Sequence, residues 1–324
     1  GSGSAEVAQL LQFNRVDYLA VAYADEGVSL RQNGIDLPIM VMNPSPETFA
    51  TLLEHRLEPE IYSMRLLTEW AEWAKGEEFT LHLKIDTGMH RLGFLPDELP
   101  DVIAYLNANP LLRVATVFSH LVGADESVFN SFSRTQFERF VQATDLLEQG
   151  LGYQPTRHLL NSAGIVRFPE FRLDMVRLGI GLYGIESSQI EPGQVMPVGT
   201  LRTVVSQIKT VWAGDTVGYS RRGVLDHDAR IATLAIGYAD GYDRRFGNGV
   251  GEVWVNGTRC PTVGNVCMDM TMIDVTAANV AEGDEVELFG TNLSVSDLAK
   301  RIGTIPYELL TNVSERVKRI FFTE

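Results

Sequence analysis

The first 185 residues alternate short apolar segments with amphipathic segments of helical period. Such alternation is typical of repeated strand–helix units around a parallel sheet. Helices are expected at 5–13, at 45–56 and at 131–150, where Gly150 would end the last one. The strands expected in this part of the chain are 17–22, 39–42, 60–62, 79–85, 114–120, 157–162 and 175–181.

These seven strands are one short of the eight in a closed barrel, where each strand is followed by its helix. The eighth would precede residue 1, and the segment 5–13 would be its helix. An open, doubly wound sheet of seven strands is the alternative. The pattern predicts an α/β fold, a (β/α)8 TIM-type barrel lacking its first strand in this chain, over residues 1–195.

After residue 195 the pattern changes to strands separated by turns, which predicts a second, mainly-β domain over residues 196–324. The segment "VNGT" at 255–258 indicates a hairpin, because Asn-Gly readily adopts the positive φ angles of a tight turn. A short helix is expected at 294–303. The expected strands are 201–211, 230–239, 251–260, 270–275 and 284–290.

Composition narrows the choice of partners. A formal net charge of −15 would repel both nucleic acid and an anionic membrane surface. The longest apolar segments are too short for a membrane span. Cys260 and Cys267 are the only cysteines, so the sequence supports neither a zinc site nor a disulfide framework, and we expect a cytoplasmic protein.

Two of the expected barrel strands end in residues with catalytic potential. The segment "HLKIDTGMHRLGF" at 82–94 groups Lys84, Asp86, His90 and Arg91. His120 ends the next strand. Catalysis in barrels takes place at the carboxyl ends of the strands. The alternatives are a buried salt bridge for the first group and a hydrogen-bonded core histidine for His120.

The last two expected strand ends suggest a phosphate site. They carry "HLLNSAG" at 158–164 and "MVRLGIGLYG" at 175–184. Small and glycine-rich turns expose backbone N–H groups, and the loops after the last two strands commonly bind phosphate in this architecture. The alternative is that the glycines only permit close packing.

Four segments of the second domain carry little information singly but much in their order. They are "VGYS" at 217–220, "GYADGY" at 237–242, "VGNVCMDM" at 263–270 and "IPYELL" at 305–310. Together with the barrel segments they resemble the alanine racemases, and the resemblance extends to "SERVKRIFF" at 314–322. That family joins an eight-stranded barrel to a β domain and forms a head-to-tail homodimer whose active sites draw on both subunits.

The resemblance implies pyridoxal 5'-phosphate as the cofactor. Arg177 would face the pyridine nitrogen; because an arginine does not readily give up a proton, the ring stays a weaker electron sink, which favours racemisation over transamination. The cofactor phosphate would be held by Asn161 and Ser162, the backbone of Gly179 and Ile180, and the hydroxyl of Tyr307.

The resemblance also assigns the residues that act on the substrate. Tyr219 would be one of two catalytic bases and would reach into the partner's site, with Arg91 and His120 supplying the positive charge that a phenolate needs. Lys84 corresponds to a position that can be carbamylated and then orients Arg91. The partner-chain residues that line the substrate entrance and receive its carboxylate would be Tyr238, Met268 and Asp269.

The chain departs from the family in one respect. The cofactor lysine would lie just upstream of Gly1, which matches the glycine of its motif. Another lysine, such as Lys75, is not placed to replace it. Residues 1–324 alone are therefore expected to be nearly inactive, and we expect a longer protein, with the Gly-Ser stretch suggesting a fusion behind a cell-wall ligase domain.

The expected function is interconversion of L-alanine and D-alanine, which supplies D-alanine for peptidoglycan. One alternative is a racemase or decarboxylase of the same fold that acts on another amino acid; Arg177 argues against a decarboxylase, which places an acid at the ring nitrogen. The other is a non-catalytic dimerisation or cofactor-holding module. The retained Tyr219, Arg91 and His120 argue against that module.

Overall fold

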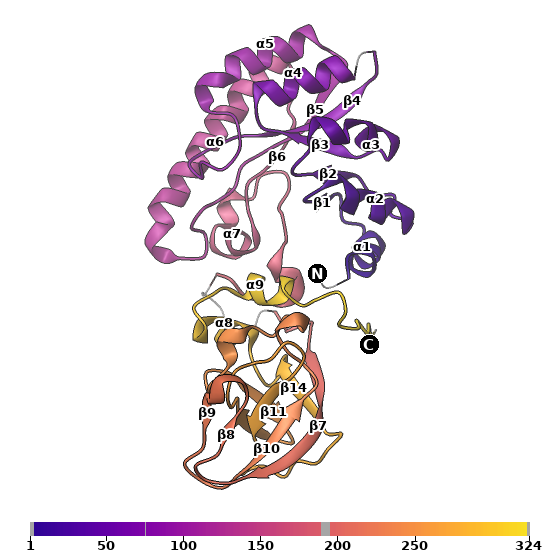
Figure 1. The fold of residues 1–324 in the computed structure, drawn as a ribbon. Helices are drawn as coiled ribbons and strands as arrows, with labels where there is room; N and C mark the ends of the chain where they lie inside the picture. Colours follow the sequence, from indigo (N-terminus) through magenta and orange to yellow (C-terminus); the bar gives the residue numbers. More distant parts are fainter. Residues whose placement is uncertain (1–2, 75, 189–194, 323–324) are drawn as a thin grey trace. The chain divides into compact units, whose positions relative to one another are not determined.

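The computed structural model describes residues 3–74, 76–188 and 195–322. These residues form two compact units, each with its own hydrophobic core (Figure 1). We call residues 4–181 and 186–188 the barrel unit, and residue 3 with 182–185 and 195–322 the C-terminal unit. Gly1 and Lys75, both considered above, lie outside the described residues.

The sheet of the barrel unit has six parallel strands whose spatial order is their order in the chain. A doubly wound sheet would reverse direction at one point, so this order is that of a barrel wall and excludes the alternative. The strands are β1 (Leu19–Val21), β2 (Ile39–Val41), β3 (Glu58–Ile61), β4 (Phe79–Lys84), β5 (Leu112–Phe118) and β6 (Thr156–His158).

Helices alternate with these strands and lie along the outside of the sheet (Figure 1). Their apolar faces cover it; Phe49 and Trp70, for example, are fully buried and meet edge to face. They are α1 (Ser4–Phe13), α2 (Ala24–Gln32), α3 (Phe49–Glu54), α4 (Met64–Trp73), α5 (Leu99–Ala108), α6 (Asn130–Leu151) and α7 (Ser162–Arg167). Short 3-10 turns occupy Pro46–Thr48, Pro96–Glu98, Ser127–Phe129 and Pro169–Phe171.

Helix α6 continues past the glycine that was expected to end it. Gly150 lies inside the helix, where a Cβ atom would come within 2.6 Å of the Ile103 side chain. Gly152 ends the helix instead, in the left-handed conformation with φ of 75°. Gly150 therefore serves the contact between α5 and α6, and the expected stop signal is wrong by two residues.

The seventh expected strand, 175–181, does not form a regular strand. Met175 makes a single parallel bridge to His158, so this segment follows β6 around the wall as expected. The backbone N–H groups of Gly179 and Gly181 then donate to the Ser162 hydroxyl, at 2.9 and 3.3 Å, rather than to a neighbouring strand. A 3-10 turn, Ile180–Tyr183, follows.

The C-terminal unit is built on a six-stranded antiparallel sheet with the order β12-β11-β14-β7-β10-β13. The expected hairpin joins β11 to β12, with φ of 45° at Asn256 and 81° at Gly257. Its strands are β7 (Leu201–Val211), β10 (Ala229–Leu234), β11 (Glu252–Val255), β12 (Thr258–Pro261), β13 (Thr271–Asp274) and β14 (Glu285–Phe289). A two-stranded ribbon, β8 (Thr216–Val217) and β9 (Gly223–Val224), and two helices, α8 (Val295–Arg301) and α9 (Pro306–Thr311), complete it.

Within the part of the chain that the structure describes, there is no helix of the length and apolar character that crossing a bilayer requires.

Candidate active site

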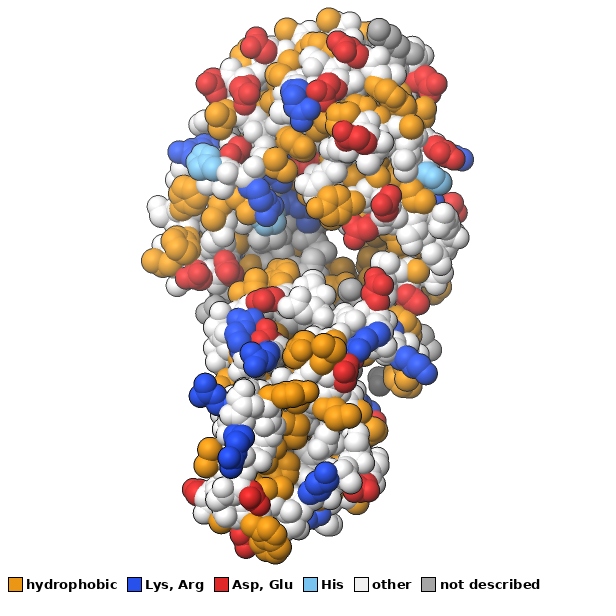
Figure 2. All heavy atoms as spheres, viewed as in Figure 1, with side chains coloured by type: hydrophobic (Ala, Val, Ile, Leu, Met, Phe, Trp, Pro, Cys, Tyr) orange, Lys and Arg blue, Asp and Glu red, His pale blue; other side chains and the backbone are white. Residues whose placement is uncertain are grey.

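The parallel strands of the barrel unit bring basic side chains to their carboxyl ends. Lys84 is the last residue of β4, His120 follows β5 by two residues, and Arg177 lies on the segment that follows β6 around the wall. Lys and Arg side chains lie close to a histidine on the face of this unit seen in Figure 2. The segments that carry Lys84, His120 and Arg177 therefore lie close together in the barrel unit.

Arg177 is held by hydrogen bonds to buried acceptors. Its Nη1 donates to His158 Nδ1 at 2.8 Å and to the His158 carbonyl at 3.1 Å. Its Nη2 donates to the carbonyls of Ser119, at 2.7 Å, and Leu159, at 3.1 Å, and lies 3.3 Å from His120 Nδ1. Burial lowers the pKa of Arg177 to about 10, which leaves it charged at neutral pH. The guanidinium is thus fixed by the fold.

Lys84 has a buried acidic neighbour that the sequence argument missed. Its Nζ lies 4.0 Å from Glu60 Oε1 and 4.2 Å from the centre of the Phe118 ring. Burial raises the pKa of Glu60 and lowers the pKa of Lys84, and their mutual attraction opposes both shifts. Glu60 Oε2 is buried without a hydrogen-bond partner among the described residues. A carboxylate inside a strand segment, "EPEI", was the signal in the sequence.

His120 is neutral in this environment. Burial, followed by the charges of Arg177 and Lys84, lowers the pKa of the ring to about 3. The expectation that His120 supplies positive charge therefore does not fit, because the ring is largely buried and its neighbours are already cationic. Arg91 is exposed, and its charge contributes to the shifts of both His120 and Glu60. Of the two residues expected to supply positive charge, Arg91 is therefore the one that remains.

Ser162 organises the glycine turn expected to bind phosphate. Its hydroxyl accepts from Gly179 and Gly181, and Gly179 is exposed with only Ser162 Oγ, at 3.8 Å, near the place of a Cβ atom. Asn161 caps α7 by accepting from the N–H of Gly164 at 2.9 Å. Ile180 is buried and anchors the turn. The turn leaves room beside exposed backbone for a small anionic group.

Tyr219 lies in a strained, exposed turn of the C-terminal unit. It begins the 3-10 turn Tyr219–Arg221, and its side chain is 70% exposed. Ser220 and Arg221 adopt positive φ angles of 57° and 54°. The Asn265 side-chain amide donates to the Tyr219 carbonyl at 3.2 Å. Backbone contacts thus fix the turn and leave the phenol projecting.

Tyr238, Met268 and Asp269 share one edge of the C-terminal unit. The N–H groups of Tyr238 and Ala239 donate to the carbonyls of Cys267 and Met268, each at 3.0 Å. Arg316, which the sequence argument did not single out, joins the edge through Nε–Asp240 Oδ1 at 2.8 Å and Nη2–Asp269 Oδ1 at 2.7 Å. Tyr307 is also exposed and lies on α9.

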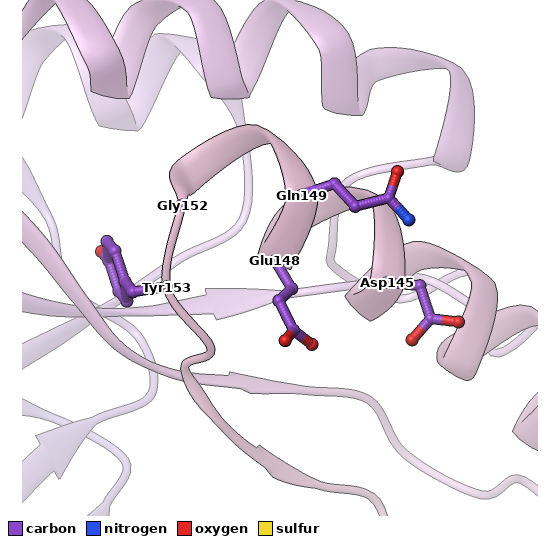
Figure 3. Close-up of a pocket in the computed structure, with 5 residues that line it drawn as sticks. All are labelled: Asp145, Glu148, Gln149, Gly152 and Tyr153. Atoms are coloured by element: carbon purple, nitrogen blue, oxygen red, sulfur yellow. The ribbon is translucent and has the colours of Figure 1, made fainter.

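The open hollow in Figure 3 has a volume of about 490 Å³ and does not belong to this site. It lies at the C-terminal end of α6, hence before β6 and at the amino ends of the strands. Acidic side chains on its wall would repel a phosphate. Its lining residues are Asp145, Glu148, Gln149, Gly152 and Tyr153.

Comparisons with known proteins agree over both units. Residues 1–187 match the alanine racemase N-terminal domain, and residues 198–321 match the alanine racemase C-terminal domain. An alanine racemase of Carboxydothermus hydrogenoformans is 40% identical over 333 residues, which cover 99% of this chain and 89% of the relative. One of Clostridium tetani is 36% identical over 337 residues, covering 100% of this chain and 87% of the relative.

Solved structures give the same result. The alanine racemase of the D-cycloserine producer Streptomyces lavendulae superposes with a TM-score of 0.93 at 30% identity, covering 100% of this chain and 88% of that chain. The enzyme of Clostridium difficile superposes with a TM-score of 0.90 at 35% identity, covering 98% of this chain and 84% of that chain.

Proposed function

The chain belongs to the alanine racemase family, and from that premise we propose that it interconverts L-alanine and D-alanine with pyridoxal 5'-phosphate as cofactor. The observation that carries the proposal is the fixed Arg177 guanidinium at the strand ends, beside Lys84 and His120. An arginine there distinguishes a racemase from a decarboxylase of the same fold.

The glycine turn fits the phosphate of this cofactor. Ser162 already orients the backbone of Gly179 and Gly181, and the space at Gly179 would be filled by a larger residue. We assign the phosphate to Asn161, Ser162, the backbone of Gly179 and Ile180, and the Tyr307 hydroxyl, as the resemblance implies. When bound, the cofactor withdraws electrons from the substrate α carbon and so makes its proton acidic.

Arg177 limits how far that withdrawal goes. A guanidinium whose pKa is about 10 keeps its protons at neutral pH, so Arg177 would hold the ring nitrogen of a bound cofactor as a donor without giving up a proton. The resulting moderate withdrawal favours return of the proton to the α carbon. This is the difference between racemisation and transamination.

Tyr219 is our candidate for the base on one face of the substrate. Its exposed phenol projects from a fixed turn, as a group that acts on a partner subunit's site must. A phenol gives up its proton near neutral pH only beside positive charge, which Arg91 provides while His120 stays neutral. The resemblance assigns the base on the other face to the family's cofactor lysine.

The substrate carboxylate is assigned to Arg91 and to the edge formed by Met268 and Asp269, with Tyr238 lining the entrance. Lys84 would orient Arg91 after carbamylation, which the resemblance allows, because the modification converts the ammonium into an anion that can accept from the guanidinium. Without the modification, Lys84 lies beside the Glu60 carboxyl group.

Assembly and cellular role follow from the resemblance. We propose a homodimer in which the C-terminal unit of one subunit serves the barrel unit of the other. D-Alanine made in the cytoplasm would supply peptidoglycan synthesis, and the Gly-Ser stretch would join this chain to a cell-wall ligase domain. These three statements stay predictions.

A direct assay separates this function from that of a non-catalytic module. Full-length protein carrying pyridoxal phosphate is incubated with L-alanine, and D-alanine is measured by chiral chromatography. We expect an equal mixture of the two enantiomers at equilibrium. Bound cofactor without any D-alanine would favour the module instead.

A further inference from the structure

A chain of buried polar side chains leads away from Arg177 across the barrel wall. His158 Nε2 lies 2.9 Å from Thr116 Oγ1, which lies 2.8 Å from His82 Nδ1. His82 Nε2 lies 2.9 Å from Glu58 Oε2. His82, Thr116 and His158 are each 0% exposed. This series of four hydrogen bonds therefore connects Arg177 to the Glu58 carboxylate.

Strand register explains how the chain crosses the sheet. Thr116 is the register partner of His82 on β4, and His158 is the partner of Phe118 on β5. Each member stands on the next strand of the wall, from Glu58 on β3 to His158 on β6. Three polar residues in a strand interior are costly unless each is hydrogen-bonded, and here each one is.

Donor and acceptor roles in the chain follow from Arg177. A guanidinium only donates, so His158 Nδ1 must accept, and burial beside Arg177 lowers the pKa of His158 well below its ordinary value. The neutral His158 then carries its hydrogen on Nε2 and donates to Thr116. The single Thr116 hydroxyl hydrogen is left to donate to His82 Nδ1, and His82 Nε2 donates to Glu58.

Glu58 closes the chain at the edge of the core. Its side chain is 20% exposed, and its Oε2 is the last acceptor of the network. Tyr18 donates to the same carboxylate, and burial together with that carboxylate raises the pKa of Tyr18 to about 12. The carboxylate at this end accepts and Arg177 at the other end donates, so both ends impose the same direction on the hydrogen bonds between them.

We propose that Glu58, His82 and Thr116 are positioning residues that hold His158 in its Nε2–H tautomer and so aim the Arg177 guanidinium at the cofactor ring nitrogen. In the other tautomer His158 Nδ1–H would face an Arg177 N–H, and two donors repel. This inference rests on the proposed function. Its consequence is that residues remote from the substrate determine how faithfully the α proton returns to carbon.

The first test uses cofactor-free full-length protein labelled with 15N-histidine. Thr116→Val removes the hydroxyl and keeps the side-chain shape, whereas Thr116→Ser keeps the hydroxyl. We expect nitrogen NMR shifts of the Nε2–H form for His158 in wild type and T116S, and a mixture of tautomers in T116V. A single Nε2–H form in all three proteins would overturn the proposal.

The second test uses the cofactor-loaded enzyme with L-alanine. In T116V we expect kcat for racemisation to fall about tenfold with KM unchanged, the effect of one lost hydrogen bond of about 1.4 kcal/mol. Pyruvate formed per D-alanine should rise, because a misplaced Arg177 no longer protects the ring nitrogen. T116S should restore wild-type values. Equal kcat and pyruvate ratios in T116V and T116S would contradict a positioning role.

Glu58→Leu provides a variant at the accessible end of the chain, should T116V fold poorly. We expect the same changes in His158 tautomer and pyruvate ratio, but smaller, because Glu58 is four hydrogen bonds away from Arg177. A loss of thermal stability alone, with wild-type His158 shifts and pyruvate ratio, would overturn the proposal. A wild-type protein without racemase activity would refute the proposed function. The NMR result would still test whether Thr116 holds the His158 tautomer, because it is obtained without cofactor or substrate.

Discussion

The two units hold their candidate residues in opposite ways. In the barrel unit, Arg177 hydrogen-bonds to buried acceptors and Lys84 lies beside the buried Glu60. In the C-terminal unit, Tyr219 and Tyr238 are 70% and 44% exposed and project from turns whose backbones are hydrogen-bonded to Asn265 and Cys267. The barrel unit is thus organised before it meets a ligand, whereas the C-terminal residues present their side chains outward.

This difference predicts how substitutions in the two units should change stability and activity. Buried charges must be satisfied by the fold, so changing one should reduce both stability and activity. Exposed side chains make few internal contacts, so changing one should affect activity alone. The four predictions below test this contrast, from the largest expected effect to the smallest.

Tyr219→Phe should reduce racemisation about a thousandfold, equivalent to about 4 kcal/mol, because the base on one face is lost. Its unfolding free energy should change by less than about 0.5 kcal/mol, since the phenol is exposed. Rates are measured with L-alanine and stability by urea unfolding. Tyr23→Phe, which alters a comparably exposed phenol of the barrel unit, is the control and should retain full activity. A slow Tyr23 variant would contradict the assignment.

Arg177→Met should lower the unfolding free energy by about 3 kcal/mol, because His158 Nδ1 and three carbonyls lose their donor. Methionine keeps much of the volume, so the loss reports on hydrogen bonds more than on packing. Urea unfolding of the cofactor-free protein measures it. An unchanged midpoint would mean that the barrel unit is not organised around this arginine.

His120 should make the barrel unit sensitive to mild acid. The folded unit keeps the ring neutral down to a pKa of about 3, whereas the unfolded chain takes up a proton below 6.5. The unfolded state therefore binds more protons, and stability is lost as the pH falls from about 6.5 towards 3.

Between pH 7 and pH 5 the loss from this one ring should be about 2 kcal/mol. His120→Gln removes it, while carboxylates and the other histidines titrate alike in both proteins. The measurement is the unfolding free energy of the two proteins at each pH. Parallel pH dependences would contradict this account, because they would show that His120 binds its proton equally well in the folded and unfolded states.

Arg316→Gln should have only a small effect on stability, because Arg316 is exposed and solvent screens its ion pairs with Asp240 and Asp269. Loosening this edge should instead raise KM for alanine with little change in kcat, since the edge binds and does not react. Steady-state kinetics distinguish the two. A fall in kcat at constant KM would assign Arg316 to the chemical step.

The sequence predicted the architecture well because strand and helix periods are local properties. Six of the seven strands expected before residue 185, and the hairpin at Asn256 and Gly257, were confirmed. The seventh strand failed because Ser162, from a distant segment, captures the N–H groups of Gly179 and Gly181. A tertiary contact replaced the ladder that local pattern predicted.

The sequence predicted that several charged barrel residues lie close together, but not their charge states. The order of the motifs singled out Lys84, Arg91, His120 and Arg177 as candidates, and the fold of the barrel unit brings the ends of their strands together. Whether His120 carries a proton depends on burial and on neighbours from other strands, which a motif does not encode. Glu60 was missed for the same reason, since its role appears only when β3 and β4 lie side by side.

The central claim is that the organised barrel unit of one subunit and the exposed tyrosine of another serve the same racemisation. Two inactive variants, Tyr219→Phe and Arg91→Met, are co-expressed with different affinity tags, and the mixed dimer is isolated through both tags. Shared sites would leave one intact site per mixed dimer and about half of the wild-type activity. A mixed dimer no more active than either variant, or no mixed dimer at all, would contradict the claim.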